Sequence, residues 1–98
     1  MKESAVQKKL MVAINDRFGT DIYLRKIHQS MYSHAGIPDV LVCYRGKLVG
    51  IEIKTLTGKP TKLQWRELKL IREAGGVATI CFGVEDIERV IKMIEDIK

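Results

Sequence analysis

Two acidic residues, Asp39 and Glu52, stand beside or inside stretches of sequence that are otherwise almost entirely apolar. Such stretches predict buried strands, where an ionised carboxylate is costly unless it is paired or bound to a metal. Lys54 follows Glu52 by two residues and adds an ammonium group. Two carboxylates and a lysine are the groups that metal-assisted hydrolysis requires, so the three residues predict a chemical site if the fold brings them together.

The segment between the two acids predicts a β-hairpin that does so. Arg45-Gly46 is typical of a two-residue turn, and counting outward from it makes Asp39 and Glu52 directly opposed partners. Opposed positions hold their Cβ atoms about 4.5–5.5 Å apart, and Lys54 projects from the same face as Glu52. A four-residue loop keeps this register, whereas a three-residue loop would shift it by one residue.

Two like charges in opposed positions destabilise a hairpin unless something bridges them. A hard divalent cation is the natural bridge, and Mg²⁺ typically takes one or two carboxylates while it retains water. The ammonium of Lys54 then contacts a substrate phosphate or polarises the attacking water, which suits phosphodiester hydrolysis. The alternative is an Asp that closes a turn after Pro38, together with a surface pair between Glu52 and Lys54.

The rest of the chain predicts a small αβα sandwich on a mixed four-stranded sheet, in the order α-β-β-β-α-β-α, within one domain of residues 1–98. The expected elements are a helix over Ser4–Phe18, strands over Asp21–His28, Val40–Tyr44 and Leu48–Ile53, a helix over Lys62–Ala74, a strand over Val77–Phe82 and a final helix carrying Ile87, Val90, Ile91 and Ile94. The hairpin strands are apolar on both faces and should be central. The crossover through the second helix should make its two flanking strands parallel.

Gly36-Ile37-Pro38-Asp39, twelve further residues and then Glu52-Ile53-Lys54 resemble the signature of PD-(D/E)XK nucleases. Over essentially the whole chain, the setting resembles the VRR-NUC domain, the virus-type replication-repair nuclease. The features that carry this wider resemblance are Glu3 in the first helix, Gln64 at the start of the second, and Ala74-Gly75-Gly76 after it.

The resemblance implies a restriction-endonuclease-like fold and an Mg²⁺- or Mn²⁺-dependent DNA endonuclease. Free-standing phage and bacterial members resemble Holliday-junction resolvases and tend to be homodimers, whereas members fused to larger repair proteins act on flaps. On this basis Asp39, Glu52 and the backbone carbonyl of Ile53 hold the metal, and Lys54 positions the nucleophilic water. Glu3 lies near a second metal or an ordered water, and Gln64 supports the lysine.

Three of the supporting residues also have structural interpretations. Thr61 and Gln64 match a capping box, although a helical wheel puts Gln64 among the presumed buried residues Leu63, Leu68, Ile71 and Ala74. Glu3 begins a core-facing stripe, where it either joins the metal site or interacts with the helix dipole. Gln7, one turn further on, is expected to follow Glu3.

Further residues are candidates for contact with DNA. Lys59 lies in a Gly-Pro loop beside the site, and Lys62 and Lys69 share a helix face with Arg66 and Arg72. Ser30 and His34 belong to the loop that precedes Asp39. Trp65, among the cations of the helix, either stacks on a base or anchors a dimer interface, and we slightly favour the dimer. Neither a Cys–His zinc pattern, nor a Gly-rich phosphate loop, nor a Ser/His/Asp order is present.

The basic composition fits either a nucleic-acid partner or a basic surface that is simply solvated. Residues 1–82 carry 14 Lys and Arg against 7 Asp and Glu, whereas residues 83–98 carry 3 against 5, within a net charge of +5. The basic excess therefore belongs to the part that holds the motifs. No signal peptide or membrane span is apparent, so we expect reduced cysteines and a cytoplasmic protein. The resemblance to VRR-NUC domains implies that a bacterium or a phage encodes it. Homodimerisation would help so small a domain. The alternatives are a non-cleaving nucleic-acid-binding module and a sequence-reading restriction nuclease, for which 98 residues leave little room.

Overall fold

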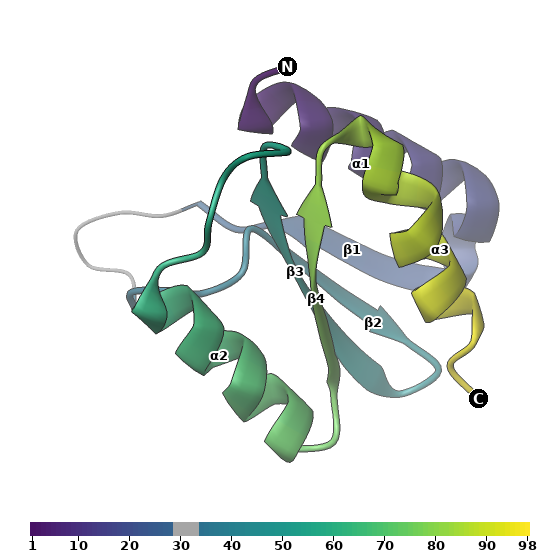
Figure 1. The fold of residues 1–98 in the computed structure, drawn as a ribbon. Coiled ribbons are helices and arrows are strands. Elements are labelled where there is room, and N and C mark those ends of the chain that lie inside the picture. Colours follow the sequence, from purple (N-terminus) through teal and green to yellow (C-terminus); the bar gives the residue numbers. More distant parts are fainter. Residues whose placement is uncertain (29–33) are drawn as a thin grey trace.

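The computed structural model describes residues 1–28 and 34–98 and contains a mixed four-stranded sheet in the order β1-β2-β3-β4. The elements are α1 (Glu3–Phe18), β1 (Ile22–Lys26), β2 (Val40–Tyr44), β3 (Lys47–Lys54), α2 (Lys62–Glu73), β4 (Val77–Phe82) and α3 (Ile87–Glu95), with short 3₁₀ turns at Gly19–Asp21 and Val84–Asp86. This confirms the predicted α/β sandwich and its element order (Figure 1). None of the described helices is long and apolar enough to cross a bilayer.

The hairpin between β2 and β3 has the predicted register. Tyr44 pairs with Lys47 across the Arg45-Gly46 turn, and the ladder runs outward as far as Val40 and Ile51. Arg45 and Gly46 both have positive φ, at 51° and 78°, as a type I′ turn requires. The strands β3 and β4 are parallel, as the crossover through α2 predicts. The two hairpin strands are therefore central in the sheet.

The helices divide between the two faces of the sheet. Figure 1 shows α1 and α3 on one side and α2 alone on the other. The larger core lies under α1 and α3, and its fully buried residues include Leu10, Ile14, Ile51 and Ile94. A smaller cluster of Leu68, Ala78 and Ile80 lies under α2. All four apolar positions predicted for the last helix are buried. The acids of the hairpin belong to the α2 face, because they alternate with residues of the larger core.

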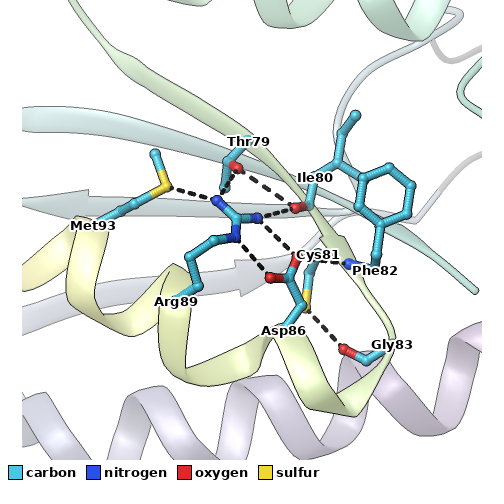
Figure 2. Close-up of polar contacts among 8 residues, drawn as sticks. All are labelled: Thr79, Ile80, Cys81, Phe82, Gly83, Asp86, Arg89 and Met93. Atoms are coloured by element: carbon cyan, nitrogen blue, oxygen red, sulfur yellow. Dashed lines mark hydrogen bonds and ion pairs between the residues drawn. The ribbon is translucent and has the colours of Figure 1, made fainter. Parts of the chain in front are cut away.

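Side chains occupy the outer edge of β4. Arg72 of α2 donates to the backbone carbonyl of Ala78 at 2.8 Å. Arg89 of α3 donates to the carbonyl of Ile80 at 2.6 Å and forms an ion pair with Asp86 at 2.6 Å (Figure 2). The hydrogen bond from Arg89 holds the pKa of Asp86 below its ordinary value. Charged side chains on an edge strand oppose pairing with another sheet, so this edge is protected.

The helix that follows the hairpin differs from the sequence expectation in which side chains it buries. Leu68 is fully buried and Ile71 is half-buried, as predicted. The predicted burial of Leu63 and Ala74 is wrong, since Leu63 is 50% exposed and Ala74 is also exposed. The physical reason is that α2 packs on β3 and β4, so one flank of the helix overlooks the half of the sheet that it does not cover.

Candidate active site

Asp39 directly precedes β2 and Glu52 lies in β3. The two residues come one step after the last pair of the hairpin ladder, which joins Val40 and Ile51. A carboxylate oxygen of Asp39 accepts a hydrogen bond from the backbone N–H of Ile53 at 2.8 Å, and the side chains of Asp39 and Glu52 are hydrogen-bonded to each other. The two acids therefore meet on one face of the sheet. The surface alternative, in which Glu52 pairs with Lys54 in solvent, is wrong because Glu52 is only 1% exposed.

Asp39 is positioned by the Gly-Ile-Pro segment that precedes it. Gly36 has φ of +86°, and a Cβ there would come within 2.6 Å of the backbone oxygen of Leu63, so only glycine lets this segment approach α2 so closely. Pro38 is buried and lies over Gly50, where a Cβ would come within 3.0 Å of the proline ring. The register pairs Gly50 with Leu41, so the contact between Gly50 and Pro38 was not predictable from the hairpin alone.

Two donors fix the backbone of Asp39 from the other side. Its carbonyl accepts the N–H of Ile27 at 2.8 Å, which continues the line of β1, and a longer bond from Nε2 of Gln7 at 3.4 Å. Gln7 is 9% exposed, so α1 presents a buried amide to the backbone of Asp39. Through this hydrogen bond, the predicted Glu3–Gln7 stripe of α1 contacts the site.

The electrostatics of Glu52 are unusual for a glutamate. Burial is the largest cause that raises its pKa, and the hydrogen bond and negative charge of Asp39 add to it. Lys54 acts in the opposite direction and Glu3 adds a further small rise, for a final value of about 9 against an ordinary 4.5. Within the described chain, Oε2 of Glu52 is a buried oxygen with no hydrogen-bond partner. Without a cation, Glu52 therefore retains its proton at neutral pH.

These groups suit a hard divalent cation. The described residues contain no group of three or more His, Cys, Asp or Glu side chains that could hold a metal, so Glu3 forms no such group with Asp39 and Glu52, and the acids that meet here number two. Mg²⁺ accepts that number, because it completes its shell with water and backbone oxygens. The Ile53 N–H faces Asp39, whereas the carbonyl of Lys54 faces β4 and accepts from Gly83 at 2.9 Å. Since backbone groups alternate along a strand, the Ile53 carbonyl also faces Asp39 and is available as the third ligand.

Lys54 ends β3 on the same face as Glu52, and its charge lowers the pKa of Glu52. The loop after it folds back, with a bond from the Gly58 N–H to the carbonyl of Thr55 at 3.0 Å. A Cβ at Gly58 would lie 3.5 Å from the Cβ of Lys54, so the loop packs against the lysine. Lys54 is consequently half-buried beside the acid pair.

Glu3 and Gln64 approach the site from different helices. Glu3 is exposed at the start of α1, and its charge reaches Glu52 and contributes to the raised pKa. Gln64 completes the capping box with Thr61: its side-chain oxygen accepts the Thr61 N–H at 2.8 Å, and its own N–H donates to the Thr61 hydroxyl at 3.2 Å. The capping interpretation is confirmed, and a role of Gln64 towards Lys54 stays a prediction.

The expected DNA contacts are distributed over α2 and the neighbouring loops. Lys59, Lys62 and Lys69 are exposed, which a phosphate contact requires. His34 is exposed and forms a 3.3 Å pair with Glu67 of α2, so it ties the loop before Asp39 to the helix. Ser30 lies outside the described residues. Trp65 is 48% exposed and stands on the same flank of α2 as Arg72, towards the β4 edge.

Helices and strands in the same arrangement occur in other proteins. Solved structures with this arrangement include a "VRR_NUC domain protein", with a TM-score of 0.73 at 20% sequence identity over 96% of this chain and 88% of that chain. A second structure, "VRR_NUC domain", has a TM-score of 0.67 at 24% identity over 89% and 95% of the two chains. A third is Hjc, a Holliday junction resolvase of Archaeoglobus fulgidus, with a TM-score of 0.60 at 14% identity over 82% and 67%.

No protein-family profile matches the sequence, and no curated protein matches it either. The likeness to VRR-NUC structures is therefore a likeness of fold, and it confirms the resemblance that the motifs predict.

Proposed function

We propose that this chain is a divalent-metal-dependent DNA endonuclease of the VRR-NUC type. The observation that carries the proposal is the environment of Glu52, a buried carboxyl group with one unpartnered oxygen beside Asp39 and Lys54. A protein gains no stability from such a group, because burial and the neighbouring acid both oppose its ionisation. A cation that binds both carboxylates removes this cost, which supports a site built for metal.

The residues divide the chemistry among them. Mg²⁺ or Mn²⁺, held by Asp39, Glu52 and the Ile53 carbonyl, would supply a bound water of lowered pKa and positive charge beside the phosphorus. Lys54 would hold the attacking water or a phosphate oxygen with its ammonium group. Glu3 would orient a further water or a second cation from α1, and Gln64 would steady the lysine from α2.

The proposed substrate is branched DNA such as a Holliday junction. The net charge of +5 favours a polyanion, and the exposed Lys59, Lys62 and Lys69 could neutralise phosphates near the site. His34 and Ser30 could contribute hydrogen bonds to the DNA backbone. The resolvase among the structures of similar fold favours a junction over a linear duplex. A homodimer would present two sites to two strands of one junction. We expect this activity in the cytoplasm of a bacterium or of a phage-infected host.

A cleavage assay tests the proposal. The protein is incubated with a synthetic four-way junction, a flap and a linear duplex, each with Mg²⁺, Mn²⁺ or EDTA. We expect cutting of the branched substrates with either metal and none in EDTA. Glu52→Gln should abolish cutting, because the amide cannot ionise to bind the cation, whereas Glu73→Gln on the exposed side of α2 should cut like the wild type.

Two results would contradict the catalytic proposal: intact substrates with every metal, or equal cutting by wild type and Glu52→Gln. Binding that persists in EDTA, without cleavage under any condition, would instead support the non-cleaving binding module.

A further inference from the structure

A groove runs along α1 beside the end of β1, and its lining is basic. The groove has a volume of about 300 Å³, and its polar lining residues are Ser4, Gln7, Lys8, Asn15 and Lys26. Lys8 and Lys26 bring two positive charges, and none of the described Asp or Glu side chains lines the groove. We call this feature the α1 groove. It is separate from the lysines of α2, because α1 and α2 cover opposite faces of the sheet (Figure 1).

Helix and strand periods explain why these side chains face the same groove. Ser4, Lys8 and Asn15 recur along α1 at spacings of four and seven residues, so they share one flank of the helix. Lys26 comes two residues after the buried Leu24, so it projects from the same face of β1, towards α1. The helix and the strand are separate segments of the chain, and only their packing brings the two lysines to one groove.

The groove offers its positive charges to a partner outside the chain. Lys8 and Lys26 are exposed, and none of the ion pairs among the described residues includes either of them. Ser4 and Asn15, which are also exposed, add a hydroxyl and an amide that can donate hydrogen bonds. A phosphodiester carries a negative charge and accepts hydrogen bonds, and ammonium, hydroxyl and amide groups are common donors to DNA phosphates. The lining therefore fits a chain of phosphates.

The α1 groove begins beside the acid pair. Gln7, which lines the groove, donates through Nε2 to the carbonyl of Asp39 at 3.4 Å. Lys26 pairs with Val40, the residue directly after Asp39. Ile27, directly after Lys26, donates its N–H to the Asp39 carbonyl at 2.8 Å. A strand of DNA that leaves the acid pair along α1 would therefore enter this groove.

The length of the groove fits several phosphates. Ser4 and Asn15 are eleven residues apart, which is about 16 Å at a rise of 1.5 Å per residue. Phosphates of one strand follow each other at about 3.4 Å along the axis of a duplex, so the groove spans about five of them. Beyond the acid pair, the exposed Lys59 and Lys62 lie at the start of α2, on the other face of the sheet.

We propose that the α1 groove binds the DNA backbone next to the scissile phosphate, with Lys8 and Lys26 as the phosphate contacts. The place of the cut rests on the proposed nuclease function, whereas binding in the groove requires no cleavage. DNA is then held on both sides of the acid pair, by the α1 groove on one side and by Lys59 and Lys62 on the other. Contacts on both sides orient the scissile phosphate between them.

The salt dependence of DNA binding tests the two lysines. The affinity for a synthetic four-way junction and for a linear duplex is measured by fluorescence anisotropy in EDTA, between about 50 and 200 mM KCl. Each phosphate that a lysine neutralises contributes about 0.9 to the slope of log K against log salt concentration. Lys8→Gln and Lys26→Gln should each reduce this slope by about 0.9, and the double variant by about 1.8.

Lys9→Gln is the matched control, because Lys9 is an exposed lysine of the same helix that does not line the groove. Its slope should equal that of the wild type. A second pair of variants changes the groove without removing a lysine. Val12 lines the groove and is 52% exposed, so Val12→Glu should fold normally by circular dichroism and weaken binding about tenfold through repulsion of phosphate. Val12→Gln, of similar size but without charge, should bind nearly as the wild type does.

Three results would overturn the proposal: an unchanged slope in the double lysine variant, an equal loss of slope in Lys9→Gln, or a wild type that binds neither DNA. Cleavage in Mg²⁺ separates this proposal from the nuclease proposal. If the slopes change as expected but the wild type cuts no substrate, the groove binds DNA and the nuclease proposal fails. If the wild type cuts and the double variant retains its slope and its cutting rate, the groove proposal fails alone.

Discussion

Glu52→Gln should stabilise the metal-free protein while it removes the metal site. The glutamine amide can donate a hydrogen bond to Asp39 as the protonated Glu52 does. Unlike a carboxyl group, it does not ionise when the chain unfolds. In the wild type, the pKa of Glu52 is about 9 in the folded chain against 4.5 in an unfolded one. At pH 7 the unfolded chain is therefore ionised and the folded chain is protonated, which favours unfolding by up to about 3 kcal/mol at 1.36 kcal/mol per pH unit.

The sign of the effect follows from proton uptake. Because the folded pKa is raised, the stability of the wild type is highest below pH 4.5 and falls as the pH rises towards 9. Glu52→Gln lacks this fall. The difference between the two proteins should thus be small at pH 4.5 and reach roughly 2 kcal/mol near pH 7, allowing for local relaxation. For a domain of this size, that corresponds to a rise in Tm of roughly 8–16 °C.

Thermal unfolding in EDTA between pH 4.5 and 8 measures this difference, with Glu73→Gln as the control that should follow the wild type. Added Mg²⁺ should then raise the Tm of the wild type and leave that of Glu52→Gln unchanged, since the cation can bind only the chain that provides both carboxylates. A Glu52→Gln variant that is less stable than the wild type at pH 7 in EDTA would refute the reasoning. A stability difference that does not change with pH would refute it equally.

Three further outcomes are expected. Lys54→Ala should lower kcat by a factor of roughly 10²–10³ and keep the Mg²⁺-dependent rise in Tm. If this variant loses the rise in Tm as well as its activity, the lysine is needed for the metal site itself. Gly36→Ala should lower the free energy of unfolding by about 2–4 kcal/mol in chemical denaturation, because it adds a backbone clash to a positive φ. Gly46→Ala, with positive φ but open space, should cost only about 1 kcal/mol. Thr61→Ala and Gln64→Ala should each lower the free energy of unfolding by about 1 kcal/mol, because each removes part of the capping box. Only Gln64→Ala should also slow cleavage. Equal cleavage rates for the two variants would show that Gln64 acts in capping alone.

The elements of the fold were predictable where the signal is local. The strands Val40–Tyr44 and Val77–Phe82 have the expected bounds, and α1 and α2 differ from the predicted ranges by one residue. The first strand was predicted too long, because its periodicity is weak and its ends depend on pairing with β2. The 3₁₀ turns were missed, since single turns of this kind follow the packing around them more than any sequence period.

The site was predictable in its centre and less so around it. The register of the hairpin follows from turn length and the two-residue period of a strand, so the meeting of Asp39 and Glu52 could be worked out from the sequence. The contacts of Gln7 and Ile27 with the Asp39 carbonyl could not, because they join segments that are distant along the chain. The same holds for the close approach of Gly36 to Leu63.

The sequence by itself determined which side chains share a face: Asp39 with Glu52 and Lys54, and Thr61 with Gln64 at the helix start. These relations depend on strand and helix periods and on turn length, all of which act over a few residues. Only the tertiary structure decided how deeply each face is covered. It buried Glu52, whose pKa is raised mainly for that reason, and it left Leu63 and Leu48 beside an open half of the sheet. Burial depends on which elements pack together across the sheet, and no local pattern records that choice.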